Sequence, residues 1–149
     1  MNNISLIKDC YGCTSCVDVC PMRCIILKQD KKGFLYPDII VEKCINCGLC
    51  LKSCPRIVKS EIRQPISSFA SISSNKQLIK CSTSGGAFAE LAKLVLNNGG
   101  KVFGCSFENN VARHIFIESI DDLKKIQKSK YVQSNLSNSF IEVKKIFIE

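Results

Sequence analysis

Two cysteine-rich segments of the chain have the same spacing. The first, residues 10–21, reads Cys-Tyr-Gly-Cys-Thr-Ser-Cys-Val-Asp-Val-Cys-Pro, and the second, residues 44–55, reads Cys-Ile-Asn-Cys-Gly-Leu-Cys-Leu-Lys-Ser-Cys-Pro. Both fit the pattern C-x₂-C-x₂-C-x₃-C-P, so the chain contains an internal duplication. Cysteine thiolates are soft ligands for iron-sulfur clusters and for zinc. The chemistry to expect from these segments is therefore metal binding.

A cubane iron-sulfur cluster needs four converging thiolates, and three cysteines at this spacing can wrap a tight loop around one of its faces. In runs of this type the fourth cysteine binds the cluster of the other repeat. The sequence therefore predicts two [4Fe-4S] clusters. The ligands of the first are Cys10, Cys13, Cys16 and Cys54, and those of the second are Cys44, Cys47, Cys50 and Cys20. Because no ligand is missing from either run, a [3Fe-4S] cluster is disfavoured.

Zinc and disulfides are the alternative uses of these cysteines. Four cysteines also suit zinc, but zinc ribbons use two separated C-x₂-C pairs. The chain has 11 cysteines, an odd number, and nine of them lie between Cys10 and Cys54. No secretory signal is visible, and no apolar run approaches the roughly 20 residues of a membrane span. These features predict a cytoplasmic protein without a membrane span, in a reducing compartment that opposes disulfides.

The composition is that of a globular protein with excess positive charge. Of the 149 residues 46% are hydrophobic, and the formal net charge is +8 with a pI near 9.0. Two oxidised clusters with four thiolates each would remove about four of these positive charges. The lysines are scattered and lack interleaved aromatic residues, so the sequence indicates no nucleic-acid surface. The expected partner is a redox protein.

The other chemically reactive residues have structural interpretations. Cys24 follows the first repeat but fits no ligand position, so we expect a small buried residue beside a cluster. Cys105 is expected in the core, whereas Cys81 is ambiguous between the core and a functional position. His114, the single histidine, is expected at a core or edge position of a strand. We assign no catalytic residue, no complete active site is visible, and whether the chain is an enzyme stays open.

The elements that must position the cysteines are short. Residues 25–27 predict a strand, residues 31–33 a turn and residues 34–37 the returning strand. A polar connection that contains Pro65 follows at residues 56–68.

The second half predicts alternating helices and strands, which is typical of an α/β domain. Gly85-Gly86 opens a predicted helix over residues 87–96, with Phe88, Leu91, Leu94 and Val95 on one face. Strands are predicted at residues 101–107 and 111–117, a helix from Ser119 to about Lys128, and a last helix from about residue 137 to the end of the chain.

The start of the first of these helices has two open interpretations. Residues 81–88 read Cys-Ser-Thr-Ser-Gly-Gly-Ala-Phe. Hydroxyl groups and two glycines before a helix can present backbone N–H groups to a phosphate or another anion. A serine at this place can equally be an ordinary N-cap.

These residues also take part in a resemblance to a known family. With Asn-Gly-Gly-Lys-Val-Phe-Gly-Cys at residues 98–105 and Ser-Lys-Tyr-Val-Gln-Ser at residues 129–134, the second half resembles the coenzyme F420 hydrogenase/dehydrogenase beta-subunit family. A two-cluster ferredoxin segment similar to residues 1–60 often comes first in that family. The resemblance implies a flavin, FAD, that converts between hydride chemistry and the one-electron chemistry of clusters. It implies that Ser82, Thr83, Ser84, Gly85 and Gly86 lie near the flavin, with Lys130, Tyr131 and Gln133 as further candidates.

The resemblance also bears on the domain organisation. Members of that family continue beyond the point where this chain stops, so we expect an incomplete second domain. The predicted fold is α+β, with a two-cluster ferredoxin-type domain at residues 1–63 and an incomplete α/β domain at residues 64–149. The missing remainder of the oxidoreductase domain is then a candidate partner, besides a separate redox protein.

Three functions compete at this point. The favoured one is an electron-transfer protein or subunit that relays single electrons to or from a flavin-type oxidoreductase site. The second is a flavin-dependent iron-sulfur oxidoreductase, or a fragment of one, acting on coenzyme F420 or another small substrate. The third is an interaction module whose unpaired sheet edge docks on a partner.

Overall fold

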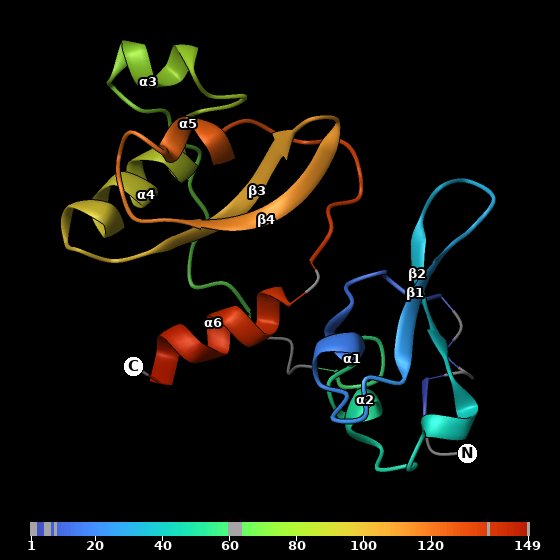
Figure 1. Ribbon diagram of the computed structural model, residues 1–149. Helices are drawn as coiled ribbons and strands as arrows, with labels where there is room; N and C mark the ends of the chain where they lie inside the picture. The colour runs from blue at the N-terminus through green and yellow to red at the C-terminus, as the bar shows by residue number, and fades with distance from the viewer. Residues whose placement is uncertain (1–2, 5–6, 8, 60–63, 137, 149) are drawn as a thin grey trace. The chain divides into compact units, whose positions relative to one another are not determined.

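The structure is a computed structural model that describes residues 3–4, 7, 9–59, 64–136 and 138–148. The chain forms two compact units (Figure 1). Unit 1 comprises Met1–Arg63 together with Leu136–Glu149, and unit 2 comprises Gln64–Asn135. Within the described ranges every helix is too short or too polar to span a bilayer.

Unit 1 contains two short helices that begin inside the cysteine repeats. Helix α1 spans Ser15–Asp18 and helix α2 spans Leu49–Lys52. The residue before each helix has a left-handed backbone, with φ 60° at Thr14 and φ 74° at Gly48. The two helices pack side by side (Figure 1), so the internal duplication is also a structural one.

A β-hairpin and a short 3₁₀ helix connect the repeats. Strands β1 (Ile25–Gln29) and β2 (Leu35–Ile39) pair antiparallel, and the 3₁₀ helix η2 spans Val41–Lys43. At the tip of the hairpin the Asp30 carboxylate accepts hydrogen bonds from the backbone N–H groups of Lys32 and Phe34, both at 2.9 Å. Gly33 supplies the positive φ that the turn requires. The hairpin thus extends beyond the predicted strands.

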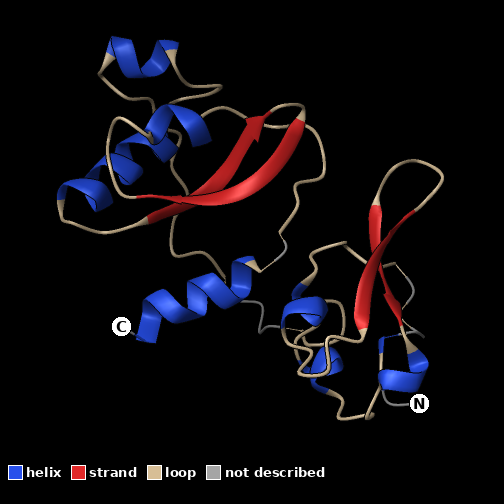
Figure 2. Cartoon of the chain, viewed as in Figure 1, coloured by secondary structure: helices blue, strands red, loops and turns tan. Residues whose placement is uncertain are grey.

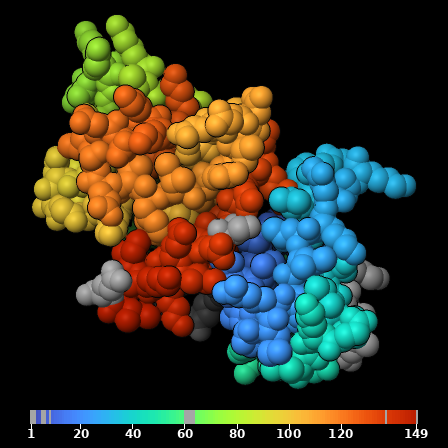
Figure 3. Space-filling model, viewed as in Figure 1, coloured from blue at the N-terminus to red at the C-terminus, as the bar shows by residue number. Residues whose placement is uncertain are grey.

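The last helix, α6 (Ser139–Ile148), packs in unit 1 against α1 (Figure 3). Its first turn is fixed by Asp18, whose carboxylate accepts hydrogen bonds from the N–H groups of Asn138 at 3.1 Å and Phe140 at 3.0 Å. A carboxylate is favourable at this end of a helix because it satisfies free N–H groups and complements the helix dipole. Unit 1 is therefore built from both ends of the chain.

Unit 2 consists of three helices and a second hairpin (Figure 2). The helices are α3 (Lys76–Lys80), α4 (Ala87–Asn97) and α5 (Leu123–Ile126), and the strands are β3 (Val102–Glu108) and β4 (Val111–Ile117). The two strands pair antiparallel around a turn in which Asn109 and Asn110 have positive φ angles, as a tight hairpin requires. An isolated parallel bridge joins Arg113 to Asn135. The mixed helix and small-sheet architecture agrees with an α+β protein, and the α/β character of this half stays a prediction.

The core of unit 2 uses the face of α4 that carries Ala89, Ala92 and Leu96. Its buried cluster consists of Leu78, Ala89, Ala92, Leu96, Ile117, Leu123 and Ile126. The face that carries Phe88, Leu91, Leu94 and Val95 is not part of this core, since these residues are between 41% and 64% exposed. The small alanine side chains let the helix backbone approach its neighbours closely, which the larger residues would prevent.

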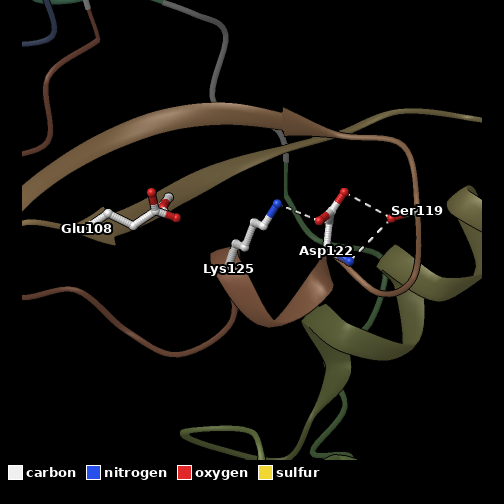
Figure 4. Close-up of polar contacts among 5 residues, drawn as sticks. Glu108, Ser119, Asp122 and Lys125 are labelled. Atoms are coloured by element: carbon white, nitrogen blue, oxygen red, sulfur yellow. Dashed lines mark hydrogen bonds and ion pairs between the residues drawn. The ribbon is translucent and has the colours of Figure 1, made fainter.

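Helix α5 is shorter than predicted and is preceded by a polar turn. The Asp122 carboxylate accepts a hydrogen bond from Ser119 Oγ at 3.0 Å and pairs with Lys125 Nζ at 2.6 Å (Figure 4). Helix α5 ends at Ile126 because Gln127 is extended and Lys128 has φ 68°. The predicted helix end near Lys128 is therefore too late.

Candidate metal centres

The four cysteines predicted to bind the first cluster line one cavity in unit 1. The cavity has a volume of about 520 Å³, and its lining includes Cys10, Cys13, Cys16 and Cys54. The first three come from the first repeat, whereas Cys54 ends the second. Thr14 and the hairpin residues Tyr36, Pro37, Asp38 and Ile39 complete much of the wall. The fold therefore brings together thiols that are far apart in the sequence.

The four cysteines predicted to bind the second cluster line another cavity of the same unit. It is tighter, at about 20 Å³, and its lining includes Cys20, Cys44, Cys47 and Cys50. In this set three cysteines come from the second repeat, and Cys20 comes from the first. Cys24 and the apolar residues Ile25, Ile39, Ile45 and Leu49 also line it.

Left-handed residues between the cysteines turn the backbone around each cavity. Gly12 and Thr14 alternate with the cysteines of the first repeat, and Asn46 and Gly48 do so in the second; all four have positive φ angles. The Gly12 N–H donates to Cys10 Sγ at 3.4 Å. Successive turned N–H groups of this kind form concave sites that favour anions. The loops thus suit the sulfur-rich, negatively charged surface of a cluster.

The first cavity is electrostatically unfavourable for thiolates without a cation. Burial, followed by the proximity of Cys13 and Cys10, raises the pKa of Cys16 to about 12. Iron ions supply the positive charge that would hold such a group deprotonated, because a coordinating thiol loses its proton outright. The donor set, the cavity and the turned backbone therefore fit an iron-sulfur cluster.

Cys24 is a fifth thiol at the second cavity. It is 2% exposed, and its sulfur lies 3.4 Å from Cys20 Sγ. Burial is the main cause that raises the pKa of Cys24 to about 11. Burial also acts on Cys20, but hydrogen bonds from Cys24 and from the backbone of Met22 and Arg23 together outweigh it and lower the pKa of Cys20. The expectation of a small buried residue at position 24 agrees with this environment.

Zinc and an iron-sulfur cluster differ in how they hold four thiolates. Across the part of the chain that the structure describes, which includes all the cysteines, no three His, Cys, Asp or Glu side chains lie close enough to hold one ion. Tetrahedral zinc binds all its sulfurs at about 2.3 Å, which brings the sulfurs very close to one another. A cubane cluster binds each thiolate through a different iron, so its four sulfurs lie further apart.

A separate cavity in unit 2 contains most of the residues predicted to bind a flavin. It has a volume of about 400 Å³, and its lining includes Thr83, Ser84, Gly85, Gly86, Cys105, Lys128 and Ser129. Thr83 Oγ1 accepts a hydrogen bond from the Ser129 N–H at 2.9 Å. This contact joins the two segments on which the family resemblance depends.

Not every predicted residue lies at this cavity. The Ser82 hydroxyl donates to the Leu78 carbonyl at 2.8 Å and so belongs to the end of α3. Lys130 and Tyr131 line a neighbouring cavity of about 410 Å³ with Lys124, Lys125 and Lys128. Among the described residues, Ser82 and Gln133 line neither of these two cavities.

The remaining reactive residues lie in unit 2. Cys81 is exposed and Cys105 is half-buried on β3. His114 lies opposite Cys105 on β4, and its Nδ1 forms a hydrogen bond with Ser134 Oγ at 2.9 Å.

Two features of the repeats escaped sequence reasoning. They are the buried hydroxyl of Thr14 and the cap that Asp18 provides to α6. The sequence contains a signal for both, because the two repeats differ there: the second repeat has Gly48 in place of Thr14 and Lys52 in place of Asp18.

Comparison with known proteins places this geometry in a family. Residues 9–58 match the 4Fe-4S dicluster domain. One subunit of the Na(+)-translocating ferredoxin:NAD(+) oxidoreductase complex of Acetobacterium woodii is 47% identical over 49 residues, which are 33% of this chain and 14% of that protein. A ferredoxin of Rickettsia felis is 39% identical over 49 residues, 32% of this chain and 40% of that ferredoxin. An uncharacterized protein in the rpl9-rpl11 intergenic region of Porphyra purpurea is 33% identical over 58 residues, 37% of this chain and 76% of that protein.

The repeated cysteine runs and the two cysteine-lined cavities define an iron-sulfur protein of the ferredoxin type. Through its first third, the chain belongs to the 4Fe-4S dicluster domain family. The prediction of an N-terminal [4Fe-4S] domain with an electron-transfer function is thereby confirmed. The chain spans 14% and 40% of the length of the two named redox proteins that it matches, so their whole activities do not transfer to it.

Proposed function

We propose that the chain relays single electrons through two [4Fe-4S] clusters whose ligands are exchanged between the repeats. One cluster takes Cys10, Cys13, Cys16 and Cys54, and the other takes Cys44, Cys47, Cys50 and Cys20. The observation that supports this assignment is that each set lines one cavity although its members come from both repeats.

The bound clusters supply one-electron storage, and the chain's own residues set the conditions for it. The eight thiolates hold the iron, and the turned backbone at Gly12 presents its N–H group to the sulfur of Cys10. Ile25 and Ile39 exclude water from the second cavity, and Ile4, Ile7 and Ile39 contribute to the wall of the first. Burial and hydrogen bonds to sulfur are the features by which a protein sets a cluster's potential.

Anaerobic reconstitution of the full chain with iron and sulfide tests the assignment. We expect about eight iron and eight acid-labile sulfide atoms per chain, from two clusters of four each, and the EPR spectrum of two interacting reduced clusters after addition of dithionite. Cys54→Ala and Cys20→Ala should each abolish one cluster, whereas Cys81→Ala should retain both. Protein that binds zinc without sulfide, or a Cys54→Ala variant with full iron content, would exclude this ligand assignment.

We further propose that residues 64–149, whose last residues pack in unit 1, correspond to part of the coenzyme F420 hydrogenase/dehydrogenase beta subunit, and that unit 2 brings a flavin into electron exchange with the clusters. The contact between Thr83 and Ser129 supports this role, since it joins the two resembling segments beside one cavity. The N–H groups at the start of α4 and the Lys128 ammonium group suit the phosphates of FAD. When bound, a flavin supplies the conversion between two-electron and one-electron chemistry.

Flavin binding is tested separately from the clusters. The full chain should quench the fluorescence of added FAD, and Lys128→Ala should weaken binding more than Lys76→Ala, a lysine at the start of α3. If the reconstituted chain holds both clusters but leaves FAD fluorescence unchanged, the electron-carrier function stands and the flavin role fails. A redox protein of the kind named among the relatives is then the proposed electron partner.

A further inference from the structure

Thr14 differs from its counterpart in the second repeat in a way that cluster ligation does not require. It follows Cys13 as Gly48 follows Cys47. Both residues adopt the left-handed conformation, with φ 60° at Thr14 and φ 74° at Gly48. Glycine accepts this backbone readily, whereas a β-branched residue is strained in it. A threonine here calls for a favourable interaction of its side chain.

No group of the described protein provides that interaction. Thr14 is 3% exposed, and its Oγ1 is buried without a hydrogen-bond partner among the described residues. Although Thr14 is the N-cap residue of α1, its hydroxyl makes no capping hydrogen bond. Buried hydroxyl groups in native proteins are nearly always hydrogen-bonded, because an unpaired one loses its hydrogen bonds to water and gains none in the protein. The partner of this hydroxyl is therefore expected outside the polypeptide.

The position of Thr14 identifies that partner. Thr14 lines the first cavity together with Cys10, Cys13, Cys16 and Cys54. A hydroxyl group can donate one hydrogen bond, and the sulfur atoms of a bound cluster are the acceptors that this cavity would contain. We propose that the Thr14 hydroxyl donates a hydrogen bond to a sulfur of the first cluster and thereby raises its reduction potential. This inference rests on the proposed ligand assignment.

The sign of this change in reduction potential follows from the charge of the cluster. Reduction adds one negative charge to the cluster, so a donor aimed at its sulfur stabilises the reduced form more than the oxidised form. Hydrogen bonds to sulfur are among the features that set such potentials. Gly48 has no side chain, so the corresponding donor is missing at the second cluster. Thr14 is thus a tuning residue and not a ligand.

Matched substitutions separate the hydroxyl from the shape of the side chain. Thr14→Val removes the hydroxyl and keeps the branched form, Thr14→Gly copies the second repeat, and Thr14→Ser keeps the hydroxyl. Ser15→Ala is the control, because the neighbouring Ser15 hydroxyl already donates to the Ser53 carbonyl at 3.3 Å. Each full-length variant is reconstituted anaerobically, its iron and sulfide are quantified, and both potentials are measured by EPR-monitored redox titration.

We expect Thr14→Val and Thr14→Gly to lower one of the two potentials and to leave the other unchanged. Thr14→Ser and Ser15→Ala should retain both wild-type values. The inference is overturned if Thr14→Val and Thr14→Gly both retain the two wild-type potentials. It is also overturned if Thr14→Ser changes a potential as much as Thr14→Val does. Iron and sulfide contents show which proposal fails. Unchanged potentials in fully loaded variants exclude only the hydrogen bond from Thr14 to the cluster. Wild-type protein without two cubane clusters excludes the ligand assignment as well.

Discussion

The two units of the molecule build their cores from different residues. The buried cluster of unit 1 contains Ile4, Cys16, Cys24, Ile25 and Cys50, so cysteines make up much of it. The buried cluster of unit 2 contains leucine, isoleucine and alanine. The two units are of similar length, so the difference lies in what their cores contain, and buried thiols add folding free energy when they bind metal. We therefore expect unit 1 to depend on metal for its fold and unit 2 to depend on side-chain packing.

Removal of the clusters should give the largest difference in protease resistance between the two units. Exposure of the reconstituted chain to oxygen and EDTA strips the iron and leaves buried thiols that cannot form an adequate core. We expect protease cleavage within residues 9–59 to rise by at least about tenfold, since loss of the metal removes the free energy of folding, while residues 76–126 keep their protection. Limited proteolysis with mass spectrometry measures both. Equal cleavage of both units would contradict the comparison.

A packing substitution in unit 2 should destabilise unit 2 and leave the iron content of unit 1 unchanged. A Cβ atom at Gly85 would lie 2.3 Å from the Ser71 carbonyl oxygen, so Gly85→Ala must displace backbone. The expected loss is about 1–3 kcal/mol in the free energy of unfolding, as for other overpacked sites. Urea denaturation followed by circular dichroism measures it, and Ser84→Ala, at the exposed neighbouring position, is the control. Loss of iron from Gly85→Ala would show that the units do not respond independently.

The same glycines show where sequence reasoning succeeds and where it stops. The Gly85-Gly86 pair correctly predicted the start of α4, because a break before an apolar run is a local signal. The packing reason for Gly85, the approach of the Ser71 backbone, is set by tertiary structure and has no signature in the local sequence. The apolar pattern placed Phe88, Leu91, Leu94 and Val95 on one face of α4, but it did not indicate that the core would use Ala89 and Ala92 on another face.

The grouping of the cysteines had a stronger signal in the sequence than the elements around them, while their ligation of clusters stays a prediction. Ligand spacing is a property of the sequence, so both sets could be named before any coordinates, and each set lies at one cavity. By contrast, α3 was not predicted, although Asn75 caps it with hydrogen bonds to the N–H groups of Gln77 and Leu78. A five-residue helix has too few positions for a periodic signal. The packing of α6 in unit 1 is a contact across more than a hundred residues, which a single sequence does not reveal.

That contact gives a test of how strongly the end of the chain is held in unit 1. Asp18→Ala removes both hydrogen bonds to the first turn of α6, and loss of such a cap costs about 0.5–2 kcal/mol. Hydrogen exchange in residues 140–148 should accelerate accordingly, while the iron content stays the same. Lys52→Ala, the matching position of the second repeat, should leave this exchange unchanged. Equal effects of the two substitutions would show that the carboxylate is not what holds α6.

The smallest expected effect concerns pH and is confined to unit 2. Burial lowers the pKa of His114 below its ordinary value near 6.5. The unfolded chain therefore binds the proton more readily, and stability that is complete above about pH 6.5 should decline as the pH falls through that value.

Urea midpoints at pH 7.5 and pH 5.5 measure the decline, and His114→Phe should reduce it while keeping a ring beside Phe103, whose centroid lies 5.2 Å from that of His114. Asp38 and Asp122 do not confound this window, because hydrogen-bonded ion pairs with Lys28 and Lys125 lower the pKa values of these carboxyls from their ordinary range, further from this window. Identical pH responses of the wild type and His114→Phe would assign the decline to other groups and would leave His114 as a packing residue of β4.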